Sequence, residues 1–214
     1  MTTFLTPRRL NQPELLDEHD APREDVDRSL RDLRRINRFL GGRSIYRRLL
    51  QRAGNVSSIV DVGAGSGDNL AAVQARLRIA VDFKIEHVAA APMHRIVADA
   101  ARLPFRAESV DVVTSAHFFH HFSELENVNI LTESLRAARR AVIVNDTRRH
   151  YAPLLFVRLL GALRLVGRIT RFDAPASVLR AYTTDEAAAV ARRIGRCDVF
   201  NLWPFRFGLI LWKT

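Results

Sequence analysis

The chain has 214 residues, 48% hydrophobic and 26% charged, which is enough for one domain with a substantial core. Its single cysteine, Cys197, excludes an internal disulfide framework, and the amino terminus lacks the apolar stretch of a cleavable signal, so we expect a cytoplasmic protein. The net charge of +10 comes mainly from arginine; it is explained by a solvated basic surface alone, or by attraction to an anionic membrane surface, an acidic substrate or nucleic acid, and it does not choose between these.

The first part of the chain is predicted to form an arm and a helical cap. Residues 1–25 are polar and charged and contain three prolines, which is typical of a loosely packed arm. From Arg23 to Ala53, apolar residues recur at helical spacing on either side of Gly41-Gly42, so two helices joined by a turn are expected. We assign residues 1–53 to this part and residues 54–214 to the main domain.

Beyond residue 54, apolar strands alternate with helical patterns. The predicted strands are 57–62, 79–82, 94–98, 109–115, 141–145, 197–203 and 206–212, and the predicted helices are 69–77, 123–138, 153–167 and 184–194. Such alternation predicts an α/β fold with a doubly wound, mostly parallel sheet and helices on both faces. The last two strands are separated only by residues 203–205 and should form a hairpin. Thr183 and Glu186 have the spacing of a capping box before the last helix.

A glycine-rich loop between the first strand and the first predicted helix is the most informative segment. It reads Val60-Asp-Val-Gly-Ala-Gly-Ser-Gly-Asp68, and glycines let a backbone approach a ligand where a Cβ would collide. A dinucleotide fingerprint would have its third glycine at position 68, where this chain has Asp68. Carboxylates at Asp61 and Asp68 are poor neighbours for a pyrophosphate. They suit a nucleoside that carries a sulfonium and an ammonium group, as S-adenosylmethionine does.

Further motifs follow the loop in order. They are Ala80-Val-Asp82, Val97-Ala-Asp-Ala100 with Leu103-Pro-Phe105, and Ser109-Val-Asp-Val-Val-Thr-Ser115. With these motifs the chain, over roughly residues 35–214, resembles class I S-adenosylmethionine-dependent methyltransferases. Within that class it is most similar to the methyltransferase-domain group that includes ubiquinone and menaquinone biosynthesis enzymes. The resemblance implies a Rossmann-like sheet with an antiparallel last strand, and S-adenosyl-L-methionine as the cofactor.

The resemblance also assigns cofactor contacts to residues at the ends of strands. They are Asp61, Gly63, Ala64, Gly65, Gly67, Asp82, Asp99, Ala100 and Ser115. Asp82 would accept hydrogen bonds from the ribose hydroxyls, and Asp99 would meet the adenine amino group unless it caps a turn. Only a helical turn at 84–89 fits before Pro92, where the family usually has a full helix, so the adenine wall is expected to be thin.

Candidate catalytic groups follow two later strands. Three histidines, His117, His120 and His121, lie among aromatic residues, and a neutral imidazole can take a proton from a phenol or enol. We favour His120 and His121 as bases, with Asp146 as a further candidate, although each histidine can instead be structural and Asp146 can cap or pair with a nearby arginine. Adjacent histidines without an acidic partner at ligand spacing do not predict a metal site.

An apolar segment with interspersed arginines, residues 151–172, lies inside a lid-like insertion at about 148–182. The arginines interrupt any membrane span. The segment lies where the family inserts its substrate cover, so the resemblance implies a lid over a hydrophobic substrate, and both shallow contact with an anionic membrane surface and plain helix packing stay open. The chain lacks the Asn/Asp-Pro-Pro-aromatic element of enzymes that methylate exocyclic amines of bases, so nucleic acid is not the expected acceptor.

The expected activity is methyl transfer to a small, largely apolar hydroxylated metabolite. A phenolic, quinol, polyketide or lipid-like acceptor would suit such a site, with methylation at oxygen favoured over carbon because His and Asp side chains could deprotonate a hydroxyl. Two alternatives stay open. The chain could be a catalytically silent protein of this fold that binds or assembles, or an RNA methyltransferase that uses its basic surface.

Overall fold

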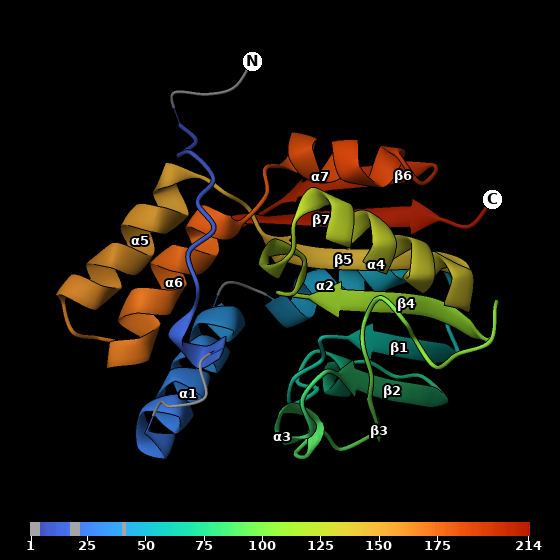
Figure 1. The fold of residues 1–214 in the computed structure, drawn as a ribbon, viewed down its shortest axis with the longest axis horizontal. Coiled ribbons are helices and arrows are strands. Elements are labelled where there is room, and N and C mark those ends of the chain that lie inside the picture. Colours follow the sequence, from blue (N-terminus) through green and yellow to red (C-terminus); the bar gives the residue numbers. More distant parts are fainter. Residues whose placement is uncertain (1–4, 18–21, 40–41) are drawn as a thin grey trace.

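The computed structural model describes residues 5–17, 22–39 and 42–214 and shows an α/β core with a group of helices beside it (Figure 1). The strands are β1 (Ser58–Val62), β2 (Leu77–Asp82), β3 (His94–Val97), β4 (Val110–Ala116), β5 (Ala138–Thr147), β6 (Cys197–Leu202) and β7 (Arg206–Trp212). The α-helices are α1 (Arg23–Phe39), α2 (Gly42–Arg52), α3 (Ile85–Val88), α4 (Glu124–Ala137), α5 (Tyr151–Ala162), α6 (Arg168–Arg180) and α7 (Thr184–Arg192). The 3-10 helices are η1 (Leu15–Asp17), η2 (Leu70–Ala72) and η3 (Phe119–His121).

The strands form one sheet in the order β3-β2-β1-β4-β5-β7-β6. All pairs from β3 to β5 are parallel, whereas β7 pairs antiparallel with both β5 and β6. This confirms the predicted mostly parallel sheet and the hairpin at its end. In chain order, β2 and β3 are added on one side of β1, and β4 then lies on the other side of β1. The carboxyl ends of β1 and β4 therefore flank the point where the strand order reverses, which is where open α/β sheets bind ligands.

Both faces of the central strands are buried. Val60 and Val62 of β1 pack in an apolar layer with α4 and α7, while Ile59 faces the opposite layer, which is built on α2. Because β1 and β4 have no solvent-facing side, their sequences are nearly continuous apolar runs. Helix α7 begins with the predicted capping box, in which the Thr183 side chain accepts from the backbone N–H of Glu186.

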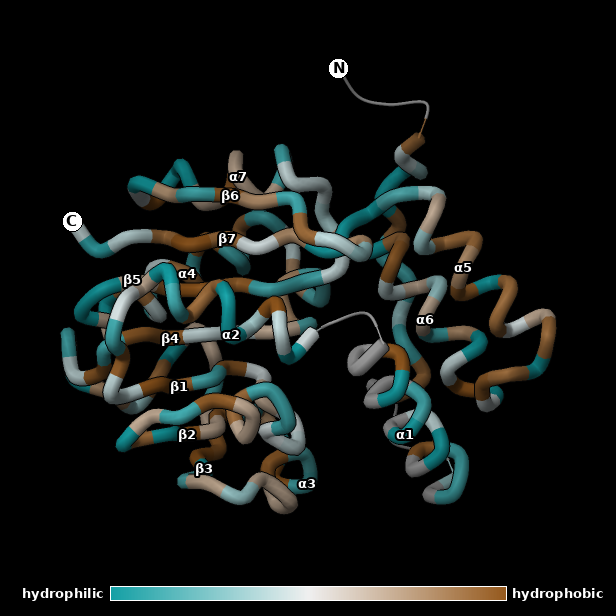
Figure 2. The backbone as a smooth tube through the Cα atoms, turned by 180° about the vertical axis from the view of Figure 1, so that it is seen from behind, coloured by the Kyte–Doolittle hydropathy of each residue, from teal (hydrophilic) through white to brown (hydrophobic). Residues whose placement is uncertain are grey.

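A second group of helices, α1, α5 and α6, stands beside the core (Figures 1 and 2). Helix α5 starts shortly after β5 ends and packs on α6 through Leu154, Val157 and Leu179. Helix α1 joins α6 through a buried 2.9 Å hydrogen bond between the hydroxyls of Ser29 and Thr170. In the described part of the chain, every helix is too short or too polar to cross a bilayer.

The predicted helix at 69–77 is wrong: only the short η2 forms there. The register of the sheet explains this result, because Leu77 pairs with Ser58 at the start of β2 and leaves too few residues for a full helix. Sheet pairing therefore overrides the helical pattern. Of the predicted Gly41-Gly42 turn, Gly41 lies outside the described residues, and α2 begins at Gly42.

The predicted helix at 153–167 corresponds to α5, which ends at Ala162. Arg164 adopts a left-handed φ of +55°, and the N–H of Leu165 donates to Leu160 O, as in a Schellman-type helix end. A second helix, α6, follows, and the sequence analysis did not identify it. Pro175 lies inside α6 and makes its sequence read as a break.

The amino-terminal arm is packed in its described part, residues 5–17, in contrast to the loose arm that was predicted. The N–H of Leu10 donates to Leu179 O at 3.1 Å, and Arg9 Nε donates to Arg180 O at 2.7 Å. The N–H of Leu15 donates to the carboxylate of Asp173 at 2.8 Å. The arm is polar because these long-range hydrogen bonds, rather than apolar contacts, fix it to α6.

Candidate functional site

The glycine loop leaves β1 at the point where the strand order reverses. Gly63, Gly65 and Gly67 have φ values of +66°, +52° and +73°, a region that other residues rarely adopt. A Cβ on Gly63 would lie 2.1 Å from the Phe118 ring, and one on Gly67 would lie 2.8 Å from Met93 Sδ. A Cβ on Gly65 would meet nothing within 4 Å. Gly63 and Gly67 thus permit close packing, whereas Gly65 borders open space that a ligand can enter.

Asp82 stands at the carboxyl end of β2 and holds this loop. Its carboxylate accepts from the N–H of Gly65 at 3.0 Å and contacts His87 Nδ1 at 3.0 Å. Burial raises the pKa of Asp82, but the hydrogen bonds from His87 and Gly65 outweigh it and lower the pKa below its usual range. The Asp82 carboxylate, which is negatively charged at neutral pH, therefore lies next to the open space at Gly65.

Asp61 lies behind the loop rather than along it. Thr114 Oγ1 donates to its carboxylate at 2.6 Å, and Tyr46 of α2 contacts the same hydroxyl at 2.7 Å. Burial raises the pKa of Asp61 to about 7. This side chain therefore joins α2 to β1 and β4, and it carries its charge only toward neutral and alkaline pH.

The other predicted cofactor residues are distributed over the same edge of the sheet. Asp99 follows β3 with an exposed side chain, and its carboxylate accepts from the N–H of Ala101 at 2.9 Å, so it does cap a turn. Ala100 is half-buried beside it. Ser115 is buried near the end of β4, and the N–H of Ala64 donates to the neighbouring β2. The structure thus brings the loop, Asp82 and Asp99 to three neighbouring strand ends.

Exposed apolar side chains next to these carboxylates were missed from the sequence. Phe83 follows Asp82 directly and is 74% exposed, and Ile85 is 57% exposed. Val97, the last residue of the adjacent β3, is also exposed. Large exposed apolar side chains at a strand end can form the wall for a purine ring. The signal in the sequence was the aromatic residue immediately after the acidic one.

His120, which belongs to η3, lies between two carboxylates. Its Nδ1 is 2.8 Å from the Asp146 carboxylate, and its Nε2 is 3.6 Å from the carboxylate of Glu14 in the arm. Burial lowers the pKa of His120, but the charges and hydrogen bonds of Asp146 and Glu14 outweigh it and raise the pKa to about 10. The imidazole is therefore positively charged at neutral pH. Asp146 thus pairs with His120.

The arm and α6 meet at this histidine. Ser177 Oγ donates to Glu14 at 2.7 Å, and Arg180 Nη1 lies 3.7 Å from the same carboxylate. Ligand atoms of Glu14, His120 and His121 lie within 4.8 Å of one another, a grouping that the sequence conceals. The guanidinium of Arg180 and the positive charge on His120 are unfavourable for a metal ion there.

His117 and Arg206 form a second polar pair at the end of β4. His117 has a left-handed φ of +54°, and its Nε2 is 2.6 Å from Arg206 Nη2. Burial and the charge of Arg206 hold the pKa of His117 well below its usual range, so the imidazole is neutral. Burial also lowers the pKa of Arg206 to about 10, which leaves it charged at neutral pH. A strained backbone next to a buried cation is typical of a functional site.

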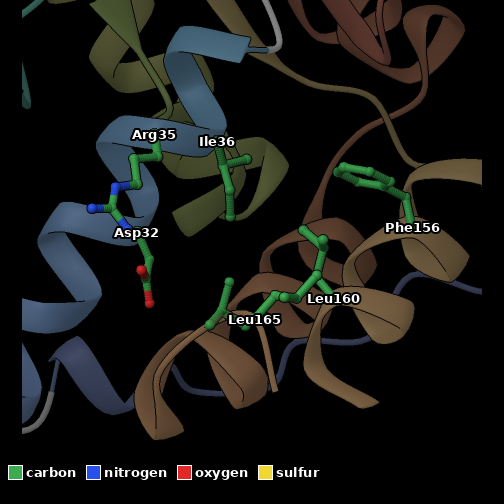
Figure 3. Close-up of a pocket in the computed structure, with 7 residues that line it drawn as sticks. Asp32, Arg35, Ile36, Phe156, Leu160 and Leu165 are labelled. Atoms are coloured by element: carbon green, nitrogen blue, oxygen red, sulfur yellow. The ribbon is translucent and has the colours of Figure 1, made fainter. Parts of the chain in front are cut away.

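An apolar pocket of about 200 Å³ opens among the helices of the second group. Its lining includes Asp32, Arg35, Ile36, Phe156, Leu160 and Leu165. Figure 3 shows Ile36 of α1 pointing toward Phe156 and Leu160 of α5. Helix α6 connects these helices to η3, because Arg180 Nη2 donates to His121 O at 3.0 Å. The pocket and the histidine segment (residues 117–121) are therefore connected through α6.

Comparison with known proteins agrees with this geometry. Residues 60–143 match the family model described as a methyltransferase domain, from the loop to β5. A search of curated proteins gave no significant match. A SAM-dependent methyltransferase from Aquifex aeolicus is 20% identical and aligns over 78% of this chain and 88% of its own, with a TM-score of 0.57. The plantazolicin methyltransferase BpumL in complex with SAH is 13% identical over 93% of each chain, with a TM-score of 0.68.

BpumL has also been solved with a monoazolic desmethylPZN analog and SAH. That structure is 14% identical to this chain over 90% of each chain, with a TM-score of 0.67. At such identities the likeness establishes a shared fold. Because the alignments with BpumL cover nine-tenths of the chain, the shared fold extends well beyond residues 60–143.

Proposed function

We propose that this chain, which carries a methyltransferase domain over residues 60–143, is a class I S-adenosylmethionine-dependent methyltransferase that methylates a hydroxyl oxygen of a small, largely apolar metabolite. The observation that carries this proposal is the apolar pocket of α1 and α5, which α6 ties to the histidine segment beside the glycine loop. A phenolic, quinol, polyketide or lipid-like acceptor has the matching chemistry, with apolar bulk for the pocket and one hydroxyl for the polar end.

The residues of the loop edge fit the cofactor. The open space beside Gly65 accepts a ligand without a clash, and Asp82 and Asp99 provide carboxylates for hydroxyl and amino groups. Phe83 and Ile85 provide apolar surface for the adenine. When bound, S-adenosylmethionine supplies a methyl group on a positively charged sulfur, so the protein has mainly to align the acceptor and exclude water.

The histidine segment divides into groups with different tasks. His120 is held as a cation by Asp146 and Glu14, so it orients the segment and does not accept a proton. His121, half-buried and stacked 4.3 Å from the ring of His120, takes the hydroxyl proton of the acceptor. The buried cation of Arg206 favours the resulting oxyanion through its positive charge.

Two measurements test the proposal. Calorimetry should show S-adenosylmethionine binding that Asp82→Asn weakens by about tenfold or more, since a charged hydrogen-bond acceptor is lost. Methyl transfer is then assayed on phenols and quinols with alkyl chains of increasing length and on azolic desmethylPZN analogs, with mass spectrometry and NMR to separate O-methyl from C-methyl products.

The pocket is tested by substitution. Phe156→Ser and Leu160→Ser should raise KM for the longer-chain acceptors about tenfold and leave cofactor affinity unchanged, because both side chains line the pocket. Leu125→Ser on α4 is the matched control, since Leu125 is an exposed leucine on the core. Equal activity on all chain lengths in the pocket variants would contradict an apolar acceptor.

A further inference from the structure

Helix α5 has two apolar faces, and only one of them is covered. Leu154 and Val157 pack on α6, as expected for a helix of this group. On the other side, Leu155, Leu159 and Leu163 follow one another at four-residue spacing and are 62%, 56% and 59% exposed. Figure 2 shows α5 as a largely hydrophobic tube at the outer edge of the molecule. A row of exposed leucines of this kind marks an interaction surface.

The charged residues in the sequence around this row are all positive. Residues 148–172 contain six arginines and no aspartate or glutamate. Four of these arginines lie on and beyond α5 and are exposed, namely Arg158, Arg164, Arg168 and Arg171. Any partner of the leucine row must therefore accept apolar side chains and carry negative charge at the same time.

We propose that the exposed face of α5, defined by Leu155, Leu159, Leu163, Arg158 and Arg164, docks on an anionic lipid bilayer. An amphipathic helix that lies in the interface plane inserts its apolar side chains among the acyl chains, while its arginines meet the headgroups. The helix is about 18 Å long at ~1.5 Å per residue, which suits shallow contact and is too short to span.

A second copy of the chain fits this face less well. A symmetric dimer through α5 would bring the arginines of both copies together, and like charges repel. The helix face also covers only about 200 Å², far below the ~800 Å² per partner of a stable interface. Nucleic acid fits less well, because the row is mainly aliphatic: Tyr151, one turn before Leu155, is exposed, but the leucines that follow offer bases no aromatic surface for stacking.

This surface borders the apolar pocket. Phe156 and Leu165 line the pocket and are themselves partly exposed on the same stretch of chain. Docking would therefore bring the pocket next to the lipid phase, where a lipid-like acceptor is concentrated. This consequence rests on the proposed function, whereas the docking itself does not.

Vesicle flotation with the full chain tests the surface. Binding is measured on phosphatidylcholine vesicles with and without an equal part of phosphatidylglycerol, at low and high salt. We expect binding to the phosphatidylglycerol vesicles only, weakened by salt. Leu155→Ser with Leu159→Ser should weaken it about tenfold or more, and Arg158→Ser with Arg164→Ser by about fivefold per arginine.

The controls use exposed residues of the same kind elsewhere. Leu125→Ser, and Arg102→Ser with Arg193→Ser, should bind vesicles like the original protein. Methyl transfer to a water-soluble acceptor without vesicles should be unchanged in all variants, which separates this test from that of the proposed function. The proposal would be overturned if the protein did not bind the vesicles, or if the control variants lost binding equally. It would also be overturned if the protein were a dimer that Leu155→Ser with Leu159→Ser converts to a monomer.

Discussion

The buried carboxyl of Asp61 should make the stability of the protein depend on pH in a defined way. Burial raises its pKa from 3.8 to about 7 in the folded chain. The folded state therefore binds a proton more tightly than the unfolded state, so this group's contribution to stability falls as pH rises from about 3.8 to about 7. A shift of about 3 units corresponds to roughly 4 kcal/mol over the whole range, at ~1.4 kcal/mol per unit.

The substitution Asp61→Asn isolates this contribution. Asparagine keeps an oxygen that can accept from Thr114 but has no titrating proton. Between pH ~5.5 and ~7.5, the free energy of unfolding of the original protein should fall by about 2 kcal/mol relative to that of Asp61→Asn. Urea unfolding followed by circular dichroism at several pH values measures this difference.

Asp111 provides the matched control. Its carboxylate accepts from the N–H groups of Ser57 and Ser58 at the start of β1. Burial raises the pKa of Asp111, but these hydrogen bonds outweigh it and bring the pKa to about 2. Asp111→Asn should therefore show a difference that is constant above pH ~5. If Asp61→Asn also differs from the original protein by a constant amount across this range, the reasoning is refuted.

Two other substitutions and one pH profile follow from the site. Gly63→Ala should destabilise the protein by roughly 2–4 kcal/mol, because its Cβ would overlap the Phe118 ring at a positive φ. Gly65→Ala should cost only about 1 kcal/mol in urea unfolding but lower S-adenosylmethionine affinity about tenfold in calorimetry, and the opposite ranking would contradict the assigned roles of the two glycines. For His120, the raised pKa means that its stabilising contribution is complete below pH ~6.5 and is lost as pH rises toward about 10. His120→Gln should therefore differ most from the original protein near pH 6 and least near pH 10, and a difference that grows with pH would argue against the charged pair.

The fold could be predicted wherever burial or near neighbours in sequence alone determine the local pattern. The central strands read as apolar runs because both of their faces are buried, and Val60 and Ile59 show this on β1. The final hairpin and the Thr183 capping box depend on near neighbours in sequence, so they were also predicted. Helix α6 was not predicted; it contains Pro175, which locally disfavours a helix interior but is accommodated in the packed structure.

Site residues could be predicted only where they lie next to a predicted strand end, and not where they are brought together from distant parts of the chain. The glycines and Asp82 lie next to strand ends and are identified by position alone. The environment of His120 depends on Glu14, which lies over a hundred residues away and on a segment whose composition suggested a loose arm. His117 was ranked below its neighbours because nothing in the sequence indicated that Arg206 would lie against it.

The packed arm also determines the order in which the site can be completed during synthesis. Residues 5–17 leave the ribosome first, yet the N–H of Leu15 donates to Asp173, which is 158 positions later. Contacts between such distant positions form late, because the intervening chain must first be arranged. The arm can therefore dock only after α6 has been synthesised and placed. Glu14 meets Ser177 of α6 and His120 of η3 in the same way, so His120 acquires its second carboxylate only when most of the chain has been synthesised.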